Sequence, residues 1–155
     1  MEIYPDFKEL LEFFNARKVE YLIVGGFAVA HHGLVRATKD IDLYVHPTRA
    51  NAERILAALH DFGFKPANLG LEDFVKPGQI IQLGYPPVRV DIITSIAGVS
   101  WEQAIAGLSQ GDYGGAPVPF IGREELIASK KATGRLQDLA DAERLEGPPS
   151  DKPTP

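Results

Sequence analysis

YLIVGGFAVAHHGLVRATKDIDLYV, the sequence of residues 21–45, holds a pair of glycines and a pair of aspartates within one short segment. The apolar run Tyr21 to Val24 predicts a strand, and the apolar stretch after Gly25 and Gly26 is compatible with a short helix. Backbone N–H groups at such a turn can hold a triphosphate, because glycine lets the chain approach closely and a helix N-terminus favours an anion. Taken alone, a glycine pair after a strand is more often a simple turn.

Asp40 and Asp42 begin the next predicted strand, residues 40–45. Side chains alternate along a strand, so both carboxylates leave on one face, ~6 to 7 Å apart. Asp is depleted from strands and two like charges on one face repel each other, so the pair indicates a cation site. Asp91, in the otherwise apolar run Arg89 to Ile93, supplies a third carboxylate. This layout predicts a two-metal phosphoryl-transfer site.

Composition limits the class of protein. The chain has 155 residues and a mass of 16.9 kDa, which predicts one domain. Its net charge of -5 argues against a broad nucleic-acid surface, although a local basic patch remains compatible with it. The absence of cysteine removes disulfides, thiolate zinc sites and thiol nucleophiles. The N-terminal residues lack a basic region and a long apolar run, so we expect a cytoplasmic protein with no membrane segment.

The remaining pattern predicts helices and strands in alternation, followed by a hairpin. Asp6 can cap a first helix, residues 28–32 predict a short helix, and Pro47 and Thr48 open a longer helix that Gly63 ends. Ser100 with Gln103 fits a capping box before a short helix, and residues 123–132 and 136–145 predict two more helices, which are split at Gly134. Further strands are expected over 80–83 and 88–93, joined through residues 84–87, and, at an edge, over 118–121. This order predicts an α/β (α+β) fold, with a mixed sheet flanked by helices, as one domain over residues 1–146. Residues 147–155 are rich in proline and should form a flexible tail.

Four sequence blocks resemble the nucleotidyltransferase superfamily that includes DNA polymerase beta. They are IVGG (23–26), RATKDIDL (36–43), VDI (90–92) and LIASKKATGRLQDLAD (126–141). The chain is most similar to the small bacterial stand-alone members, some of which resemble the nucleotidyltransferase partners of toxin–antitoxin pairs. The resemblance covers about residues 7 to 145 and implies the minimal nucleotidyltransferase fold.

The resemblance also implies roles for these residues. Asp40 and Asp42 would hold two Mg²⁺ ions, or Mn²⁺, and Asp91 would bind one ion and help to deprotonate the acceptor hydroxyl. Gly25 and Gly26 would seat the β and γ phosphates of an NTP. Attack on the α-phosphate would then expel pyrophosphate.

The basic residues of these blocks have a structural reading as well as a functional one. Lys130 is the cation that we expect to contact the triphosphate, with a solvated helix face shared with Lys131 as the alternative. Arg36, Thr38 and Lys39 precede the aspartate pair and could touch a phosphate, but loop residues of these types more often contact solvent alone. Asp138 and Asp141 lie three apart on a predicted helix, where pairing with Arg135 or Arg144 is favoured over a second metal site.

The sequence therefore predicts an enzyme that moves an NMP from an NTP to a hydroxyl on RNA, a protein or a small molecule, with a toxin–antitoxin setting and a toxin partner as one context. A drug transferase of the aminoglycoside or lincosamide type is the alternative enzyme, although such enzymes usually need an added helical domain or a dimer partner. A module that binds a nucleotide or a partner without appreciable turnover is the alternative outside the enzymes. The presence of all three acids favours an enzyme.

Overall fold

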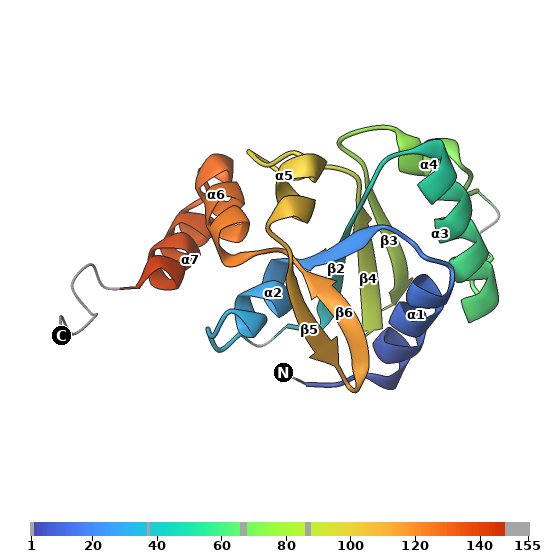
Figure 1. Ribbon diagram of the computed structural model, residues 1–155, viewed down its shortest axis with the longest axis horizontal. Coiled ribbons are helices and arrows are strands. Elements are labelled where there is room, and N and C mark those ends of the chain that lie inside the picture. Colours follow the sequence, from blue (N-terminus) through green and yellow to red (C-terminus); the bar gives the residue numbers. More distant parts are fainter. Residues whose placement is uncertain (1, 37, 66–67, 86–87, 148–155) are drawn as a thin grey trace.

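The computed structural model describes residues 2–36, 38–65, 68–85 and 88–147, and within them a mixed six-stranded sheet packs against helices (Figure 1). The strands are β1 (Tyr21–Val24), β2 (Asp40–Val45), β3 (Ile80–Tyr85), β4 (Val88–Ile93), β5 (Ser109–Tyr113) and β6 (Ala116–Phe120). The helices are α1 (Pro5–Ala16), α2 (Gly25–His31), α3 (Arg49–Phe62), α4 (Glu72–Val75), α5 (Trp101–Ala106), α6 (Arg123–Thr133) and α7 (Leu136–Glu146). This architecture confirms the predicted α/β (α+β) class and is that of the minimal nucleotidyltransferase fold.

The sheet has the strand order β3-β4-β2-β1-β6-β5. β2 pairs in parallel with β4 and antiparallel with β1, so the strand with the aspartate pair lies in the middle of the sheet. β3 and β4 form the predicted hairpin, and β1 pairs in parallel with β6. A central position fixes the register of β2 from both sides, which makes it a rigid support for a site.

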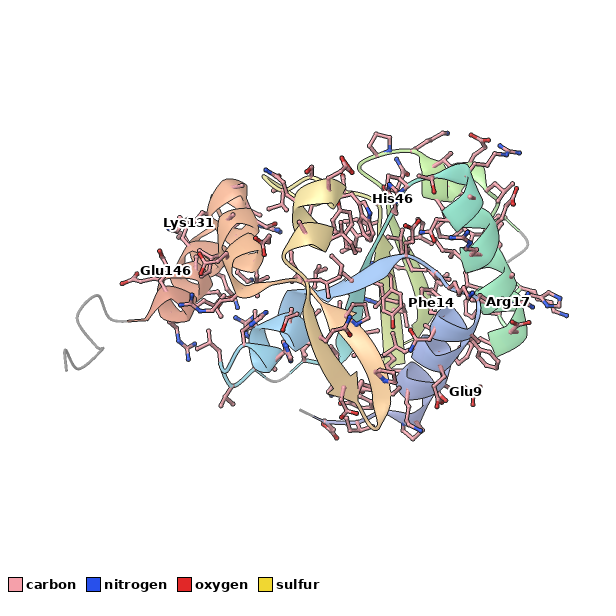
Figure 2. The ribbon with its side chains drawn as sticks, viewed as in Figure 1. Glu9, Phe14, Arg17, His46, Lys131 and Glu146 are labelled. Atoms are coloured by element: carbon pink, nitrogen blue, oxygen red, sulfur yellow. The ribbon has the colours of Figure 1, made fainter. Side chains whose placement is uncertain are left out.

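Alternation along the central strands separates the core from the polar face. Ile41 and Leu43 are fully buried, whereas Asp40 and Asp42, which alternate with them, are only half-buried. Helix α1 buries Phe7, Leu10, Leu11 and Phe14, and Figure 2 shows Phe14 between α1 and the strands. Burial of each such side chain contributes about 1.5 to 3 kcal/mol relative to exposure. In Figure 1, α1 and α3 lie on one side of the sheet, and α6 and α7 extend from the other side next to α2.

Helix boundaries follow the predicted caps closely for α3 and α5. The Thr48 side chain accepts a hydrogen bond from the backbone N–H of Asn51, and Gly63 ends α3 in the left-handed conformation. Ser100 and Gln103 form the predicted capping box of α5. Asp6 does not cap α1, because Pro5 already begins the helix and Tyr4 takes the capping position.

Two other predictions need correction, and two elements were not expected. Helix α2 begins at Gly25, directly after β1, and not at residue 28. The strand predicted at an edge over 118–121 is β6, which is interior because β5, not expected from the sequence, covers its other side. β6 pairs with β1 only at Phe120, opposite Ile23. Pro117 and Pro119, which have no backbone N–H, therefore do not interrupt hydrogen bonds to β1. Helix α4 was also not expected.

Some predictions lie outside the described residues, namely the proline-rich tail after Gly147 and Pro86 and Pro87 of the hairpin turn. Among the helices that are described, none is long and apolar enough to span a membrane.

Candidate active site

The acidic residues come together because β2 and β4 are parallel neighbours. Their register pairs Asp42 with Asp91 and Asp40 with Arg89. Residues two apart on a strand share a face, so these four side chains form one charged face of the sheet. The three carboxylates predicted as the catalytic set are therefore neighbours, and a cation, Arg89, is among them.

The glycine turn lies directly against this face. Val24, the last residue of β1, pairs with Asp42, so the chain turns into α2 beside the Asp42 side chain. Gly25 has φ +68°, a conformation that L side chains rarely adopt, and a Cβ added there would overlap Oδ2 of Asp42. A Cβ at Gly26 would lie 3.0 Å from the Cβ of Thr38. Glycine at position 25 is thus required both by the turn and by the close approach of Asp42.

Asp42 lies beside the carboxyl of Asp91 and is perturbed by it. Burial raises the pKa of Asp42 to about 7, and the charge of Asp91, a hydrogen bond with Asp91 and the charge of Asp40 act in the same direction, against the opposing effect of Arg89. Asp91 is 8% exposed, and its Oδ1 has no hydrogen-bond partner among the described residues. Such a buried oxygen is available to a hydroxyl or a cation.

A pocket of about 270 Å³ opens over Asp42 and Asp91. Gly25 and the two aspartates form one side of it, and Ser129, Lys130, Thr133, Arg135 and Asp138 of the α6–α7 hairpin form the other polar side. The remaining lining is apolar and consists of Val24, Ile80, Ile93, Ile96, Ile121 and Leu126. The pocket thus combines an acidic floor, a polar wall that includes two cations, and an apolar wall.

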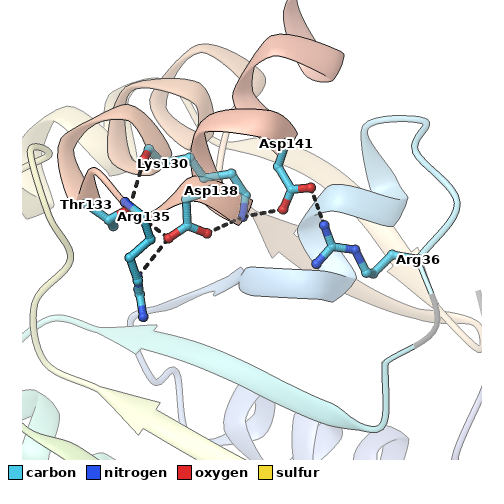
Figure 3. Close-up of polar contacts among 6 residues, drawn as sticks. All are labelled: Arg36, Lys130, Thr133, Arg135, Asp138 and Asp141. Atoms are coloured by element: carbon cyan, nitrogen blue, oxygen red, sulfur yellow. Dashed lines mark hydrogen bonds and ion pairs between the residues drawn. The ribbon is translucent and has the colours of Figure 1, made fainter.

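Lys130 points into a network of charges at this wall (Figure 3). Its Nζ lies 3.1 Å from Oδ2 of Asp141 and 3.3 Å from Oδ1 of Asp138. Asp138 also accepts hydrogen bonds from Thr133, at 2.7 Å, and from Arg135, at 3.0 Å. The Lys130 side chain is only 11% exposed, so it does not belong to a solvated helix face. Lys131 instead pairs with Glu146 at the exposed surface (Figure 2).

Asp141 connects this network to the segment before β2. It forms an ion pair with Arg36 in addition to that with Lys130, and it is 3% exposed. Burial acts to raise the pKa of Asp141, but hydrogen bonds and charges from Arg36 and Lys130 outweigh it and hold the pKa below its ordinary value. The predicted pairing of Asp138 with Arg135 is confirmed, whereas the partners of Asp141 are Arg36 and Lys130 rather than Arg144.

The other predicted phosphate contacts face a different space. Arg36, Thr38 and Lys39 line a pocket of about 440 Å³ together with Glu2, Tyr4, Phe27 and Ala30. The structure therefore does not bring them into the pocket above Asp42. Thr38 remains next to the glycine turn, and its hydroxyl donates a 3.2 Å hydrogen bond to the carbonyl of Asp40.

Arg89 is the residue of this site that the sequence reasoning missed. Its Nη2 donates a 2.8 Å hydrogen bond to Oδ2 of Asp40, and its Nε lies 3.3 Å from Oδ1 of Asp91 without hydrogen-bond geometry. The signal was an arginine two residues before Asp91, which shares the face of that aspartate. Its contact with Asp40 depends on the register between β2 and β4.

The oxygens of Asp42 and Asp91 fit a divalent cation, since Mg²⁺ is held in proteins by carboxylates and water. The Asp91 oxygen without a hydrogen-bond partner supports this fit. Asp40 is bound by Arg89, and among the described residues no three acidic or histidine side chains are placed to hold a metal together. A complete set of three carboxylates thus requires Asp40 to release Arg89.

Comparisons with known proteins agree with this geometry. A family model, aminoglycoside-2''-adenylyltransferase, matches residues 6–125, and no curated protein matches the chain. Among solved structures, a candidate nucleotidyltransferase from Thermotoga maritima has a TM-score of 0.58 at 18% identity, covering 94% of this chain and 93% of its own. The antibiotic-resistance factor ANT(2'')-Ia has a TM-score of 0.53 at 20% identity, and the match covers 96% of this chain and 75% of that one. The lincosamide antibiotic adenylyltransferase LnuA has a TM-score of 0.54 at 16% identity, and the match covers 95% of this chain and 99% of that one. At these identities the likeness establishes the fold.

Proposed function

Since this chain belongs to the aminoglycoside-2''-adenylyltransferase family and thereby to the nucleotidyltransferases, we propose that it transfers an NMP, from ATP in the first instance, to a hydroxyl of a small cationic acceptor. The observation that carries the proposal is the Asp42–Asp91 pair, directly opposed on parallel strands beneath the pocket and beside the Gly25 turn.

Asp91 is suited to accept the proton of the acceptor. Its Oδ1 has no hydrogen-bond partner among the described residues, so it can accept a hydrogen bond from the acceptor hydroxyl. In the proposed reaction the acceptor oxygen forms a bond to the α-phosphorus, and the bond from that phosphorus to the α–β bridging oxygen breaks. The electron pair of the broken bond leaves with pyrophosphate, and the acceptor proton passes to Asp91.

Two Mg²⁺ ions, or Mn²⁺, bound by Asp40, Asp42 and Asp91 would neutralise charge on the attacking and leaving oxygens. The chain's own groups would orient the donor. The Gly25–Gly26 turn would present backbone N–H groups to the phosphates, and Lys130 would approach the triphosphate from α6. The apolar wall, which includes Ile93 and Leu126, would exclude water from one side.

Charge favours a cationic acceptor over a polyanion. The chain carries a net charge of -5, and the floor of the pocket is acidic. Such a field attracts an amine-bearing sugar and repels RNA, whose backbone would demand a basic surface. The family match ends at residue 125, so α7 and most of α6, which form the opposite wall, lie outside it. We therefore propose the acceptor class, an amine-bearing polyol, and not one particular drug.

The test is a transfer assay with α-labelled NTPs and Mg²⁺, in which pyrophosphate release and label on the acceptor are both measured. The acceptors are an aminoglycoside with a free 2''-hydroxyl, a lincosamide, total RNA and a protein extract. We expect label on the aminoglycoside, with a mass gain of one NMP, and none with Asp42→Asn. Label on RNA or protein would reassign the acceptor, and NTP binding without transfer to any acceptor would favour a binding module.

A further inference from the structure

Arg89 occupies the position of a counter-ion in the acidic face. It lies on β4 opposite Asp40 and two residues before Asp91, and its guanidinium reaches both carboxylates. Its side chain is 31% exposed, so solvent reaches part of it. One positive charge is thus placed between two of the three carboxylates that a metal would need.

Arg89 forms fewer hydrogen bonds in this face than its guanidinium group could donate. A guanidinium has five N–H donors, yet its contact with Asp40 is a single 2.8 Å hydrogen bond, and its Nε lacks a hydrogen-bond partner among the described residues. On the other side of the same contact, Oδ1 of Asp91 is also without a partner. Arg89 Nε and Asp91 Oδ1 lie 3.3 Å apart but do not form a hydrogen bond. Charge attraction therefore holds this contact, and another cation can readily take the place of Arg89.

We propose that Arg89 is the internal counter-ion of the metal-free site, which competes with divalent metal for Asp40 and Asp91 and thereby makes tight metal binding depend on the triphosphate. The inference rests on the proposed function, since it concerns the metal of the same reaction. It assigns a residue that sets metal affinity without itself reacting.

The physical reason for this dependence is a displacement. A divalent cation entering the face repels the guanidinium, which must leave Asp40 and find another anion. Metal alone offers no such anion, so part of its binding free energy is spent on moving Arg89 away. An NTP bound above the same face offers phosphate oxygens, with which arginine pairs well. Metal and NTP should then bind cooperatively, and the coupling should be lost when position 89 carries no charge.

The experiment is calorimetric titration of the full chain with Mg²⁺, first alone and then with a non-hydrolysable ATP analogue, for wild type, Arg89→Gln and Arg89→Lys. We expect Arg89→Gln to bind Mg²⁺ alone about tenfold more tightly than wild type, and to gain much less from the analogue. Arg89→Lys keeps the charge and should stay close to wild type. Arg17→Gln is the matched control, because Arg17 pairs with Asp61 at the exposed surface.

The folded state of each variant is followed by the shift of the melting temperature on adding Mg²⁺, which should be larger for Arg89→Gln than for wild type. Equal or weaker Mg²⁺ binding by a folded Arg89→Gln would overturn the inference alone. A wild-type protein that binds no Mg²⁺ even with the ATP analogue would overturn the metal dependence in the proposed function as well. An Arg89→Gln protein that is unfolded with and without Mg²⁺ would also overturn it, because Arg89 would then be structural.

Discussion

At the scale of residues, the site depends on Asp40, Asp42 and Asp91, whose negative charges repel one another, and on Gly25, which has no side chain. Asp42 is pressed between the Gly25 turn and Asp91, so burial and neighbouring charges both favour its protonated form. This arrangement lowers stability in the metal-free protein, which is common where a site is prepared for a cation.

Asp42→Asn should stabilise the metal-free protein at pH 8 by about 1 to 3 kcal/mol and abolish transfer. The folded pKa of about 7 lies above the ordinary 3.8, so the folded state keeps a proton that the unfolded chain releases between these values. The free energy of unfolding of wild type should therefore fall as pH rises from 4 to 7 and stay level above 7. The amide can donate to Asp91 without a charge, which removes this dependence. Thermal melts in EDTA over pH 4 to 8 measure it.

Asp61→Asn is the control, because a hydrogen bond from Arg17, together with the charges of Arg17 and His60, lowers the pKa of Asp61 against the opposing effect of burial. Its stability contribution is present above the ordinary pKa and is lost as pH falls, so this substitution should destabilise at neutral pH. If Asp42→Asn were also less stable than wild type at pH 8, the aspartate pair would be a structural element rather than a cation site.

Gly25→Ala should destabilise the fold by about 2 to 4 kcal/mol, because it combines a positive φ with overlap of the new Cβ and the Asp42 carboxylate. Gly78→Ala is the matched control, since Gly78 has φ +74° but nothing within 4 Å of an added Cβ, and it should cost about 1 to 2 kcal/mol. Urea titrations of both variants measure the difference. Equal losses would mean that Asp42 can move away from the turn at no cost.

At the scale of elements, the α6–α7 hairpin forms one wall of the pocket and places basic side chains opposite the sheet. Leu126 and Ile127 are buried and fix α6, which turns Lys130 toward the pocket and Lys131 toward the surface, about 100° away. Asp138 and Asp141 come from α7 and hold Lys130 in place, and Asp141 also joins the hairpin to Arg36. The position of the cation therefore depends on the packing of both helices.

Lys130→Ala should weaken binding of Mg²⁺–NTP by about 1 to 3 kcal/mol, as expected for the loss of a charge-assisted contact. It should also lower stability, because the buried Asp141 loses one of its two cations. Lys131→Ala, which removes only an exposed pair with Glu146, should change both quantities little. Titration of both variants with the same NTP decides the point, and indistinguishable affinities would remove Lys130 from the triphosphate site.

At the scale of the whole molecule, a small fold collects negative charge around one pocket. Three carboxylates from two central strands share a face with one arginine, so this region attracts cations before any ligand arrives. The polar wall of the pocket comes from the far end of the chain, more than 80 residues after β2. Triphosphate and metal are therefore expected to meet between the sheet and the α6–α7 hairpin.

Removal of divalent metal should weaken NTP binding at least tenfold, because phosphates would otherwise face repelling carboxylates. Calorimetric titration of wild type with ATP in Mg²⁺ and in EDTA measures the change. The same titration with Asp91→Asn should show a smaller difference, since one of the carboxylates is neutral. Equal ATP affinity in Mg²⁺ and EDTA would contradict a metal-dependent site.

The elements whose causes are local could be predicted from the sequence. The β2 alternation of Asp40, Ile41, Asp42 and Leu43, the start of α3 next to Thr48, the capping box at Ser100, and the break at Gly134 between α6 and α7 were all predicted, because each depends on neighbours within a few residues. The three acids were predicted as a set because aspartates are rare in apolar strands.

Which of these groups meet depends on the tertiary structure. The parallel register of β2 and β4 allows Arg89 to pair with Asp40, and the packing of α7 on α6 allows Lys130 to pair with Asp138 and Asp141. Neither contact can be predicted from the spacing of residues along the chain. The interior place of β6 depends on β5, whose polar sequence carries no strand pattern and which forms because β6 offers it hydrogen bonds. The local sequence thus defines the type of each side chain and the element that carries it, whereas long-range packing determines its partners. The reason is that ion pairs and strand pairs depend on distance in space and not on distance along the chain.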